Sequence, residues 1–270
     1  MRPRIAVVGS VNLDLVTRCE LLPRPGETVT GASFRRFPGG KGANQAVACA
    51  RLGAEVTMIG AIGDDSFAEE ALAGLREAGV TVDLQVTDDS TGIAVVLVDA
   101  AGETEIVVAA GANAALGAVE LPEHHAVLCQ LEVPDRAVES AWERCTGLFC
   151  LNAAPARPVA VDPDLTVVNA HELEALTRRD GLVALTLGAA GAVLLEDGEE
   201  IARAAPPPVE AVDGTAAGDA FTACLLVSVL EGRGLEEALE RGCAAGALAA
   251  SRVGAQPSLP TTAEIDAILS

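Results

Sequence analysis

Residues 212–226 combine small residues with a carboxylate in an order that suits proton transfer beside a bound anion. Ala216, Ala217 and Gly218 precede an apolar run without proline or glycine, which predicts a helix. The first amides of a helix have no partner within it, so these could form an anion hole. Asp219 would lie in the first turn. There it either caps the helix or takes a proton from a hydroxyl that attacks a phosphoryl group.

A glycine loop near the start of the chain holds the only lysine. Lys41 lies in PGGKGAN, and the following residues predict a helix over about 42–52 that is closed by Gly53. Lys41 and Asn44 would lie at the start of this helix, where they can face a ligand. A plain surface lysine is the alternative, but its place in a glycine loop favours a role in binding.

Two further polar residues follow the first expected strand. Residues 5–8 are apolar and rich in β-branched side chains, which predicts a buried parallel strand. Asn12 and Asp14 come just after it, and ligands of open α/β sheets bind at the carboxyl ends of strands. The two side chains are two residues apart in an extended segment, so they could hold one ligand; an Asx turn is the alternative.

Polar or glycine residues also end four successive strands in the second half of the chain. The strands are expected at 126–132, 148–151, 165–168 and 183–187. The residues at their ends are Gln130 and Glu132, Asn152, Asn169 and Glu172, and Gly188 and Gly191. This recurrence predicts a ligand cleft along one edge of the sheet.

The remaining pattern predicts an α/β protein with a mostly parallel sheet and a small extra sheet. The other expected elements are strands at 55–61 and 84–86 and helices at 66–78, 218–230, 235–252 and 262–269. Two hairpins interrupt the alternation, one over 21–37 and one in which 91–99 and 103–109 flank the turn 99–102. They predict a small β-sheet that covers the cleft as a lid.

Composition excludes several classes of function. The net charge of −21 disfavours binding to nucleic acid or to anionic membranes. The seven cysteines form no CxxC pair, and their odd number argues against a disulfide framework or a zinc site. No signal peptide or membrane span is recognisable, so the protein is expected to be cytoplasmic.

Several separated motifs occur in the order seen in one enzyme family. They are GSVNLDL, PGGKGANQAVACARLG, AGANAAL at 110–116, CQLEVP, LNAAPA, NAHE, TLGAAG, DGTAAGDAF and GAQPSLP. Over nearly its whole length the chain resembles the ribokinase branch of the PfkB-type sugar kinases. The resemblance implies a single ribokinase-like three-layer α/β domain over residues 1–270. Helices would cover both faces of a mostly parallel central sheet, with a small β-sheet lid from about 13–38 and 91–110.

The resemblance also implies an ATP-dependent kinase that converts D-ribose to D-ribose 5-phosphate at its primary hydroxyl. Asp219 looks like the base, and the amides of Ala216, Ala217 and Gly218 look like the hole for the transferred phosphoryl group. The positions that match sugar-binding residues are Asn12, Asp14, Gly40, Lys41, Asn44, Glu132 and Asp219. Two alternatives stay open: a kinase for deoxyribose, fructose, ketodeoxygluconate or a nucleoside, and a sugar- or nucleotide-binding relative with weakened catalysis.

Cofactor positions follow from the same resemblance. The residues that match the nucleotide site are Asn169, Glu172, Thr186, Gly188, Gly191, Gly218 and Cys243. Glu172 belongs to the family's NxxE pattern and would hold Mg²⁺ through water. The positions that match an activating K⁺ site are Asp213, Thr215, Ala249, Gly254 and Ser258.

The chain departs from the family pattern in three places. Gly214 stands where relatives usually have threonine, which loosens the cation loop, and LNAAPA replaces the usual NPAPA. The segment between Glu172 and Thr186 is short and lacks a helix and a strand on the nucleotide side. The resemblance also implies a homodimer formed through the lid, which would cover the apolar residues on both faces of 91–109. Packing of that outer face on its own domain is the alternative.

Overall fold

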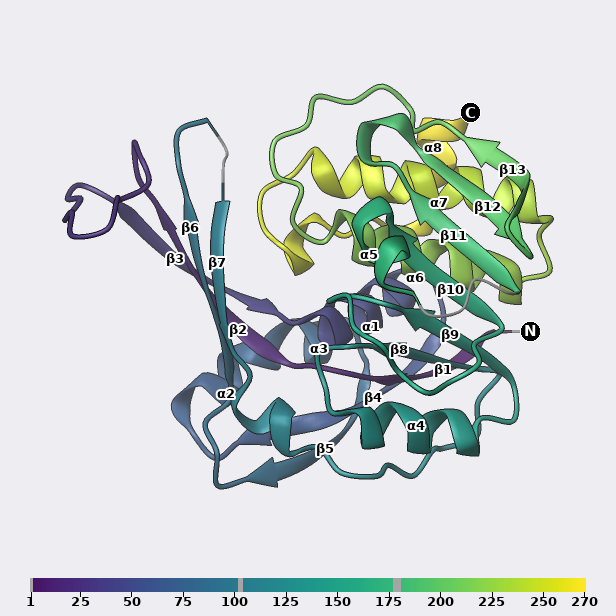
Figure 1. The fold of residues 1–270 in the computed structure, drawn as a ribbon, viewed down its shortest axis with the longest axis horizontal. Helices are drawn as coiled ribbons and strands as arrows, with labels where there is room; N and C mark the ends of the chain where they lie inside the picture. The colour runs from purple at the N-terminus through teal and green to yellow at the C-terminus, as the bar shows by residue number, and fades with distance from the viewer. Residues whose placement is uncertain (1, 102–103, 177–180) are drawn as a thin grey trace.

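A nine-stranded sheet forms the centre of the protein (Figure 1). The structure, a computed structural model, describes residues 2–101, 104–176 and 181–270. The strand order is β13-β12-β11-β10-β9-β8-β1-β4-β5, with β12 antiparallel to both of its neighbours and all other pairs parallel. The strands are β1 (Arg4–Val8), β4 (Glu55–Gly63), β5 (Thr81–Thr87), β8 (Ala126–Gln130), β9 (Leu148–Asn152), β10 (Leu165–Asn169), β11 (Leu182–Thr186), β12 (Ala192–Glu196) and β13 (Glu199–Ala204).

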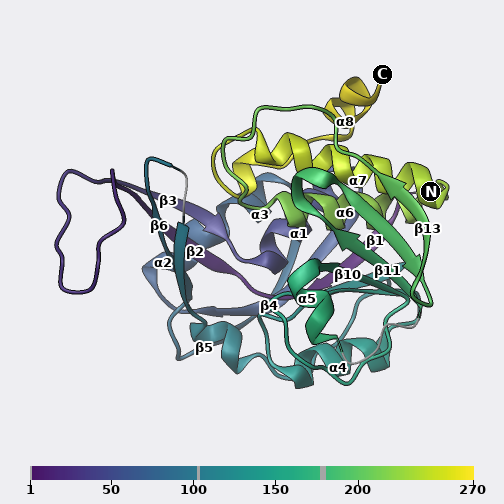
Figure 2. The same ribbon diagram turned by 45° about the horizontal axis from the view of Figure 1, so that its top comes forward.

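Helices cover both faces of this sheet, which explains why its parallel strands are almost continuously apolar (Figures 1 and 2). On one face lie α1 (Lys41–Arg51), α2 (Ser66–Ala71), α3 (Ala73–Glu77), α6 (Ala217–Leu230), α7 (Leu235–Ala250) and α8 (Thr262–Leu269). On the other face lie α4 (Asp135–Arg144), α5 (Ala170–Ala175) and the 3₁₀ turn η1 (Gly111–Ala115). The expected three-layer α/β fold is therefore confirmed.

A second sheet of four strands stands away from the main body (Figure 1). Its order is β3-β2-β6-β7, with β2 (Asn12–Arg18) parallel to β6 (Gly92–Val98) and antiparallel to β3 (Ser33–Gly39). The expected hairpin of β6 with β7 (Thr104–Ala109) is confirmed, although Gly102 of its turn lies outside the described residues. The small sheet begins where β1 ends, so its base adjoins the carboxyl edge of the main sheet.

The first hairpin differs from the expectation. The antiparallel pair is Asn12–Arg18 with Ser33–Gly39, and residues 19–32, with two prolines and two glycines, connect the strands instead of pairing. Asn12 and Asp14 are consequently strand residues of β2, and the Asx-turn alternative is wrong. The helix expected over 66–78 divides into α2 and α3 at Leu72, just before Gly74, a poor helix former.

Four other elements were missed or shortened in the sequence interpretation. The strand expected at 84–86 extends over Thr81–Thr87, and β12, β13 and α4 were not anticipated. The two antiparallel strands lie at an edge of the sheet, and the charged residues of β13 obscure its pattern. Part of the shortened segment between Glu172 and Thr186, residues 177–180, lies outside the described residues. None of the described helices is long and apolar enough to cross a membrane.

Candidate active site

Packing of α1 against α6 encloses Asp219 among amide side chains. α6 is apolar around its whole circumference and is buried from Asp219 to Ser228. Asp219 is 6% exposed; its Oδ2 accepts a hydrogen bond from Asn44 Nδ2 at 2.9 Å and its Oδ1 one from Gln45 Nε2 at 2.8 Å. The carboxylate thus does not cap its own helix. Each oxygen keeps a lone pair that can accept a proton or a hydroxyl hydrogen.

A chain of buried amides fixes the orientation of Asp219. Gln45 Nε2 also donates to Asn152 Oδ1 at 2.9 Å, and Gln130 Nε2 donates to Gln45 Oε1 at 2.6 Å. Gln130 and Asn152 come from the ends of β8 and β9, which are neighbours in the sheet. Because every bond in the chain is made in a buried environment, rotation of the carboxylate would break several of them.

The turn before α6 presents two open amides beside this carboxylate. Ala216 has the left-handed backbone conformation (φ 60°) and is the residue that precedes the first turn of the helix. Ala217 N donates to Gly214 O at 3.2 Å, so that amide is engaged within the turn. The amides of Ala216 and Gly218 have no hydrogen-bond acceptor among the described residues. Two of the three predicted donors therefore remain free for an anion.

Glu132 joins the loop after β8 to the start of α1. Its Oε2 accepts from Ser10 Oγ at 2.5 Å and from the Lys41 amide at 3.1 Å. Gly40, which precedes α1, has φ 87° and lies against the backbone of Ser10 and Asn12. These contacts hold the glycine loop, Glu132 and the beginning of β2 together at the carboxyl edge of the main sheet.

Asn113 of η1 fixes Asn12. Its Nδ2 donates to Asn12 Oδ1 at 2.8 Å and to Val11 O at 3.1 Å, while its Oδ1 accepts from Val11 N at 2.9 Å. A Cβ on Gly92 would come within 2.2 Å of both asparagine side chains, so this position requires glycine. Asn12 Oδ1 thereby accepts a hydrogen bond within the protein, whereas Asn12 Nδ2 donates to no described residue.

Two acceptor groups facing the same site have no donor. Asn44 Oδ1 is buried and has no hydrogen-bond partner in the described chain. The Asp14 carboxylate has none either, and it lies against Gly39, where an added Cβ would be 2.2 Å from Asp14 Oδ2. The unpaired Asn44 Oδ1 is buried, which is costly, and the Asp14 carboxylate is half-buried, so both groups are open to a bound molecule that offers hydroxyl hydrogens.

Burial and like charges set the ionisation of this site. Burial, with the carboxylates of Glu132 and Asp219 nearby, raises the pKa of Asp14 to about 7. Burial acts to lower the pKa of Lys41, but Asp219, Glu132 and Glu172 outweigh it and raise that pKa above its ordinary value. The charges of Asp219, Glu132 and Glu172 therefore favour the protonated form of the single lysine.

Most of the residues predicted for the nucleotide lie at or just after the carboxyl ends of β10 and β11. Asn169 and Glu172 form a capping box, in which Asn169 Oδ1 accepts from Glu172 N and Glu172 Oε2 accepts from Asn169 N, both at 2.8 Å. Capping therefore accounts for part of the NxxE pattern. Thr186 Oγ1 donates to Val168 O at 3.2 Å, and Gly188 and Gly191 follow with positive φ.

Cys243, the last predicted nucleotide residue, is buried in α7 against β13 (its Sγ lies 3.7 Å from Ala204 O), and burial raises its pKa to about 11.

Asp213 joins the two loops of the predicted K⁺ site. Its Oδ1 accepts from Thr215 N at 3.0 Å and Thr215 Oγ1 at 2.6 Å, and its Oδ2 accepts from Gly254 N at 3.0 Å. Burial acts to raise the pKa of Asp213, but these bonds and the nearby Arg18 lower it below its ordinary value. Ala249 and Ser258 belong to the same region, at the end of α7 and in η3 (Gln256–Ser258).

Three residues of this site were missed in the sequence interpretation. Ser10, Gln45 and Asn113 act through other side chains and carry no charge, so residue type alone gives little signal. Gln45 and Asn113 nevertheless fall inside the motifs GANQA and AGANAAL, which marked both regions.

No group of three or more metal-binding side chains exists among the described residues.

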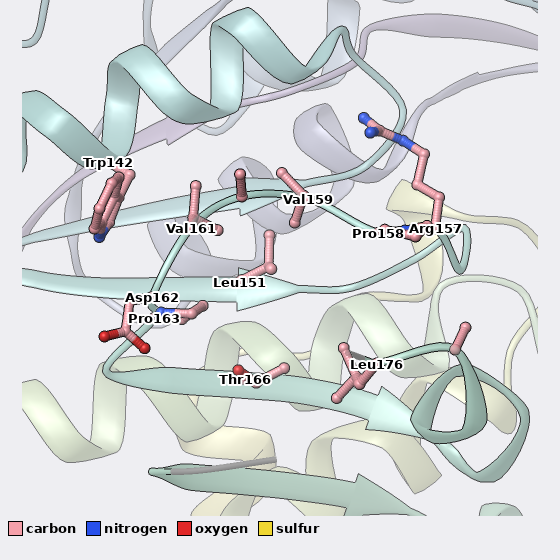
Figure 3. A pocket seen from close by; sticks show the side chains of 12 residues that line it. Trp142, Leu151, Arg157, Pro158, Val159, Val161, Asp162, Pro163, Thr166 and Leu176 are labelled. Carbon is pink, nitrogen blue, oxygen red and sulfur yellow. The ribbon is translucent and has the colours of Figure 1, made fainter. Parts of the chain in front are cut away.

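Two cavities differ in their relation to this site. One of about 550 Å³ is bounded by Val108, Ala110, Leu131, Pro155 and Glu132, the last of which is among the predicted sugar-binding residues. Another of about 300 Å³ lies on the face of the sheet that α4 and α5 cover, between α4, the segment 157–163 and the end of α5, and Arg157 borders both cavities (Figure 3). Trp142, Leu151 and Leu176 line it, and it contains none of the predicted site residues.

Comparison with known proteins identifies the family of carbohydrate kinases, a class of phosphotransferases, to which this fold belongs. Residues 2–262 match the pfkB family of carbohydrate kinases. The chain belongs to this family. A ribokinase of Bacillus subtilis is 38% identical over 98% of this chain and 99% of its own length, and one of Schizosaccharomyces pombe is 36% identical over 97% and 96%.

Solved structures agree with this assignment. A ribokinase from Thermotoga maritima superposes with a TM-score of 0.88 at 31% identity, covering 99% of both chains. An Arabidopsis thaliana ribokinase complexed with ribose and ATP superposes with a TM-score of 0.85 at 29% identity, covering 100% of this chain and 99% of that chain.

The raised pKa of Asp14 predicts a pH-dependent cost to stability in the absence of sugar. A carboxyl whose pKa rises on folding from about 3.9 to about 7 makes the folded protein less stable as the pH increases through that window. We expect Asp14→Asn to stabilise the sugar-free protein at pH 8, by up to roughly 4 kcal/mol at about 1.4 kcal/mol per pKa unit, and by less at pH 5.5. Thermal unfolding midpoints at the two pH values measure this.

Asp83 is an exposed residue of β5. Asp83→Asn is the matched control, because it also replaces an aspartate with asparagine. An equal gain from Asp14→Asn at both pH values would contradict the assignment of the cost to Asp14 ionisation.

Proposed function

We propose that the protein is an ATP-dependent kinase that transfers a phosphoryl group to the primary hydroxyl of D-ribose, giving D-ribose 5-phosphate. The observation that carries this proposal is the buried Asp219 carboxylate, oriented by Asn44 and Gln45 beside the open amides of the turn before α6. The names of the similar proteins support ribose as the acceptor.

In this mechanism Asp219 takes the proton of the attacking hydroxyl. The amides of Ala216 and Gly218 receive the phosphoryl oxygens, and Ala217 can join them if its bond to Gly214 opens. The Lys41 ammonium lies between the sugar and phosphate sides and offsets negative charge there. Mg²⁺ bound with ATP, near Glu172 through water, would neutralise phosphate charge.

The sugar would be held by side chains that the protein leaves incompletely bonded. Asn44 Oδ1 and the Asp14 carboxylate accept hydroxyl hydrogens, and Asn12 Nδ2 donates to a sugar oxygen. Glu132 and the Gly40–Lys41 backbone complete the ring of contacts. Adjacent hydroxyls on one face of a furanose need such a set of paired acceptors and donors.

The nucleotide would bind along the ends of β10 and β11, near Asn169, Glu172, Thr186, Gly188, Gly191, Gly218 and Cys243. The cysteine is almost fully buried, so its contribution there is the shape of the pocket wall and not a polar contact. All seven cysteines are free thiols, which supports a reducing compartment, and we place the enzyme in the cytoplasm.

Replacing Asp219 tests the catalytic assignment. We expect Asp219→Ala to lower kcat by ~10²–10⁴-fold, the usual contribution of a general base, while D-ribose still binds. Steady-state kinetics with ATP and Mg²⁺, together with calorimetric titration of D-ribose, separate the two effects. Comparison of D-ribose with 2-deoxy-D-ribose, D-fructose and a nucleoside decides the acceptor. Retention of most of the turnover would refute the role of Asp219.

We further propose a K⁺ site between the two loops that Asp213 joins, with Thr215, Ala249, Gly254 and Ser258 as the other contributors. The support is the close approach of these loops, since Val212 N and Asp213 N also donate to Ala250 O at 2.8 and 3.0 Å. The positive charge of a cation there would favour the binding of the negatively charged phosphoryl group to the nearby amides.

Activity should therefore be higher in K⁺ than in Na⁺ or a bulky organic cation. Gly214 leaves the loop flexible, so we expect weaker activation than in relatives with threonine. A Cβ added at this position meets no atom within 4 Å, which makes Gly214→Thr a suitable variant, and it should increase the dependence on K⁺. Equal rates in all three cations, for the wild type and for Gly214→Thr, would refute the proposed K⁺ site.

The four-stranded sheet is proposed to act as a lid over the sugar and to join two subunits. Every residue of β7 is exposed, and the exposed apolar side chains of the sheet are Phe34, Val95, Ile106, Val107 and Val108. An apolar sheet surface of this kind is a recurrent basis of symmetric association.

Sedimentation at micromolar concentration should accordingly give a dimer. Val107→Lys, at a site 70% exposed, should shift the protein to a monomer because it places a charge within the proposed interface. Ile201→Lys on β13, far from the small sheet, is the control and should leave the dimer intact. A wild-type monomer at this concentration would rule the arrangement out.

A further inference from the structure

The small sheet touches the loops that shape the phosphoryl hole. Arg18, the last residue of β2, places its Nη2 3.7 Å from Asp213 Oδ2. The Arg18 side chain is 43% exposed and that of Asp213 17% exposed, so the pair lies at the edge of the protein. This ion pair connects a strand of the lid directly to the turn before α6.

A second contact joins the neighbouring strand to the same carboxylate. Phe37 of β3 packs against Gly254, where an added Cβ would lie 3.3 Å from Phe37 Cε1. Gly254 has φ 93°, and its amide donates to Asp213 Oδ2 at 3.0 Å. The central strand β2 therefore contacts Asp213 through charge, and the edge strand β3 packs against Gly254, which is hydrogen-bonded to Asp213.

Asp213 in turn determines the shape of the hole. Its other oxygen holds the amide and hydroxyl of Thr215, and the turn continues through the bond from Ala217 N to Gly214 O. Displacement of Asp213 would alter the left-handed Ala216 and the direction of the open amides. Asn12 and Asp14 lie at the end of β2 opposite Arg18, whereas on β3 Gly39 is two residues from Phe37, which pairs with Asp14.

We propose that Arg18 is a positioning residue that links the lid to the phosphoryl hole, so that sugar binding and formation of the hole favour each other. Sugar contacts at the base of β2 and β3 order the lid, and the far end of β2 then holds Asp213 through Arg18. This inference rests on the proposed function for the identity of the two ligands. The contact itself does not depend on it.

Linkage makes the expected effect reciprocal. A non-hydrolysable ATP analogue with Mg²⁺ should strengthen D-ribose binding, and D-ribose should strengthen analogue binding by the same factor. Partly exposed ion pairs contribute modestly, so Arg18→Gln should reduce this factor by about two- to fivefold. Arg18→Lys, which keeps the charge, should restore part of it, and high salt should reduce it in the wild type.

Two measurements test the link with one set of variants. The first is calorimetric titration of D-ribose with and without the analogue. The second is hydrogen exchange of the amides of residues 214–218 in the ligand-free protein. Arg35→Gln is the matched control, because Arg35 lies on β3, is exposed and forms no ion pair among the described residues.

We expect faster exchange at 214–218 and weaker coupling in Arg18→Gln but not in Arg35→Gln. Equal exchange in the two variants would overturn the proposal. A wild-type protein that binds no sugar would refute the proposed function alone, since the exchange measurement needs no ligand. Unequal exchange with unchanged coupling would also overturn it, because the contact would then be only structural.

Discussion

The hydrogen bond from Gln45 to Asp219 is the contact on which the rest of the candidate site depends. It joins α1 to α6, and through Gln130 and Asn152 it ties both helices to the ends of β8 and β9. A buried carboxylate requires such donors. The donors that orient the carboxylate are neutral amides, and its charge in turn raises the pKa of Lys41.

The architecture of the chain was largely predictable from its sequence, whereas the hydrogen bonds that orient the side chains of the site were not. Apolar runs that stop at polar or glycine residues predicted where the strands end, and β8 to β11 indeed lie side by side. The amide chain around Gln45 could not be anticipated, because it depends on which neutral side chains meet across elements more than 80 residues apart. Likewise, the pairing of residues 12–18 with 33–39 was obscured by the polar and charged residues of both strands.

Charge explains why the site relies on backbone amides. The protein carries a net charge of −21, and Asp14, Glu132 and Asp219 add negative charge where an anionic nucleotide is to act. Long-range attraction cannot bring ATP to such a surface. The turn before α6 supplies partial positive charges that no change of pH removes, and the carboxylates of Asp219, Glu132 and Glu172 favour the charged form of Lys41.

The position of Lys41 has a consequence for chemical labelling. It is the only lysine, so an amine-directed reagent has a single side-chain target in this chain, and that target lies inside the candidate site. The carboxylates that raise its pKa also keep most of it in the unreactive ammonium form. Modification should therefore be slow in the free protein, and its rate would report how strongly bound molecules change the charge around one atom.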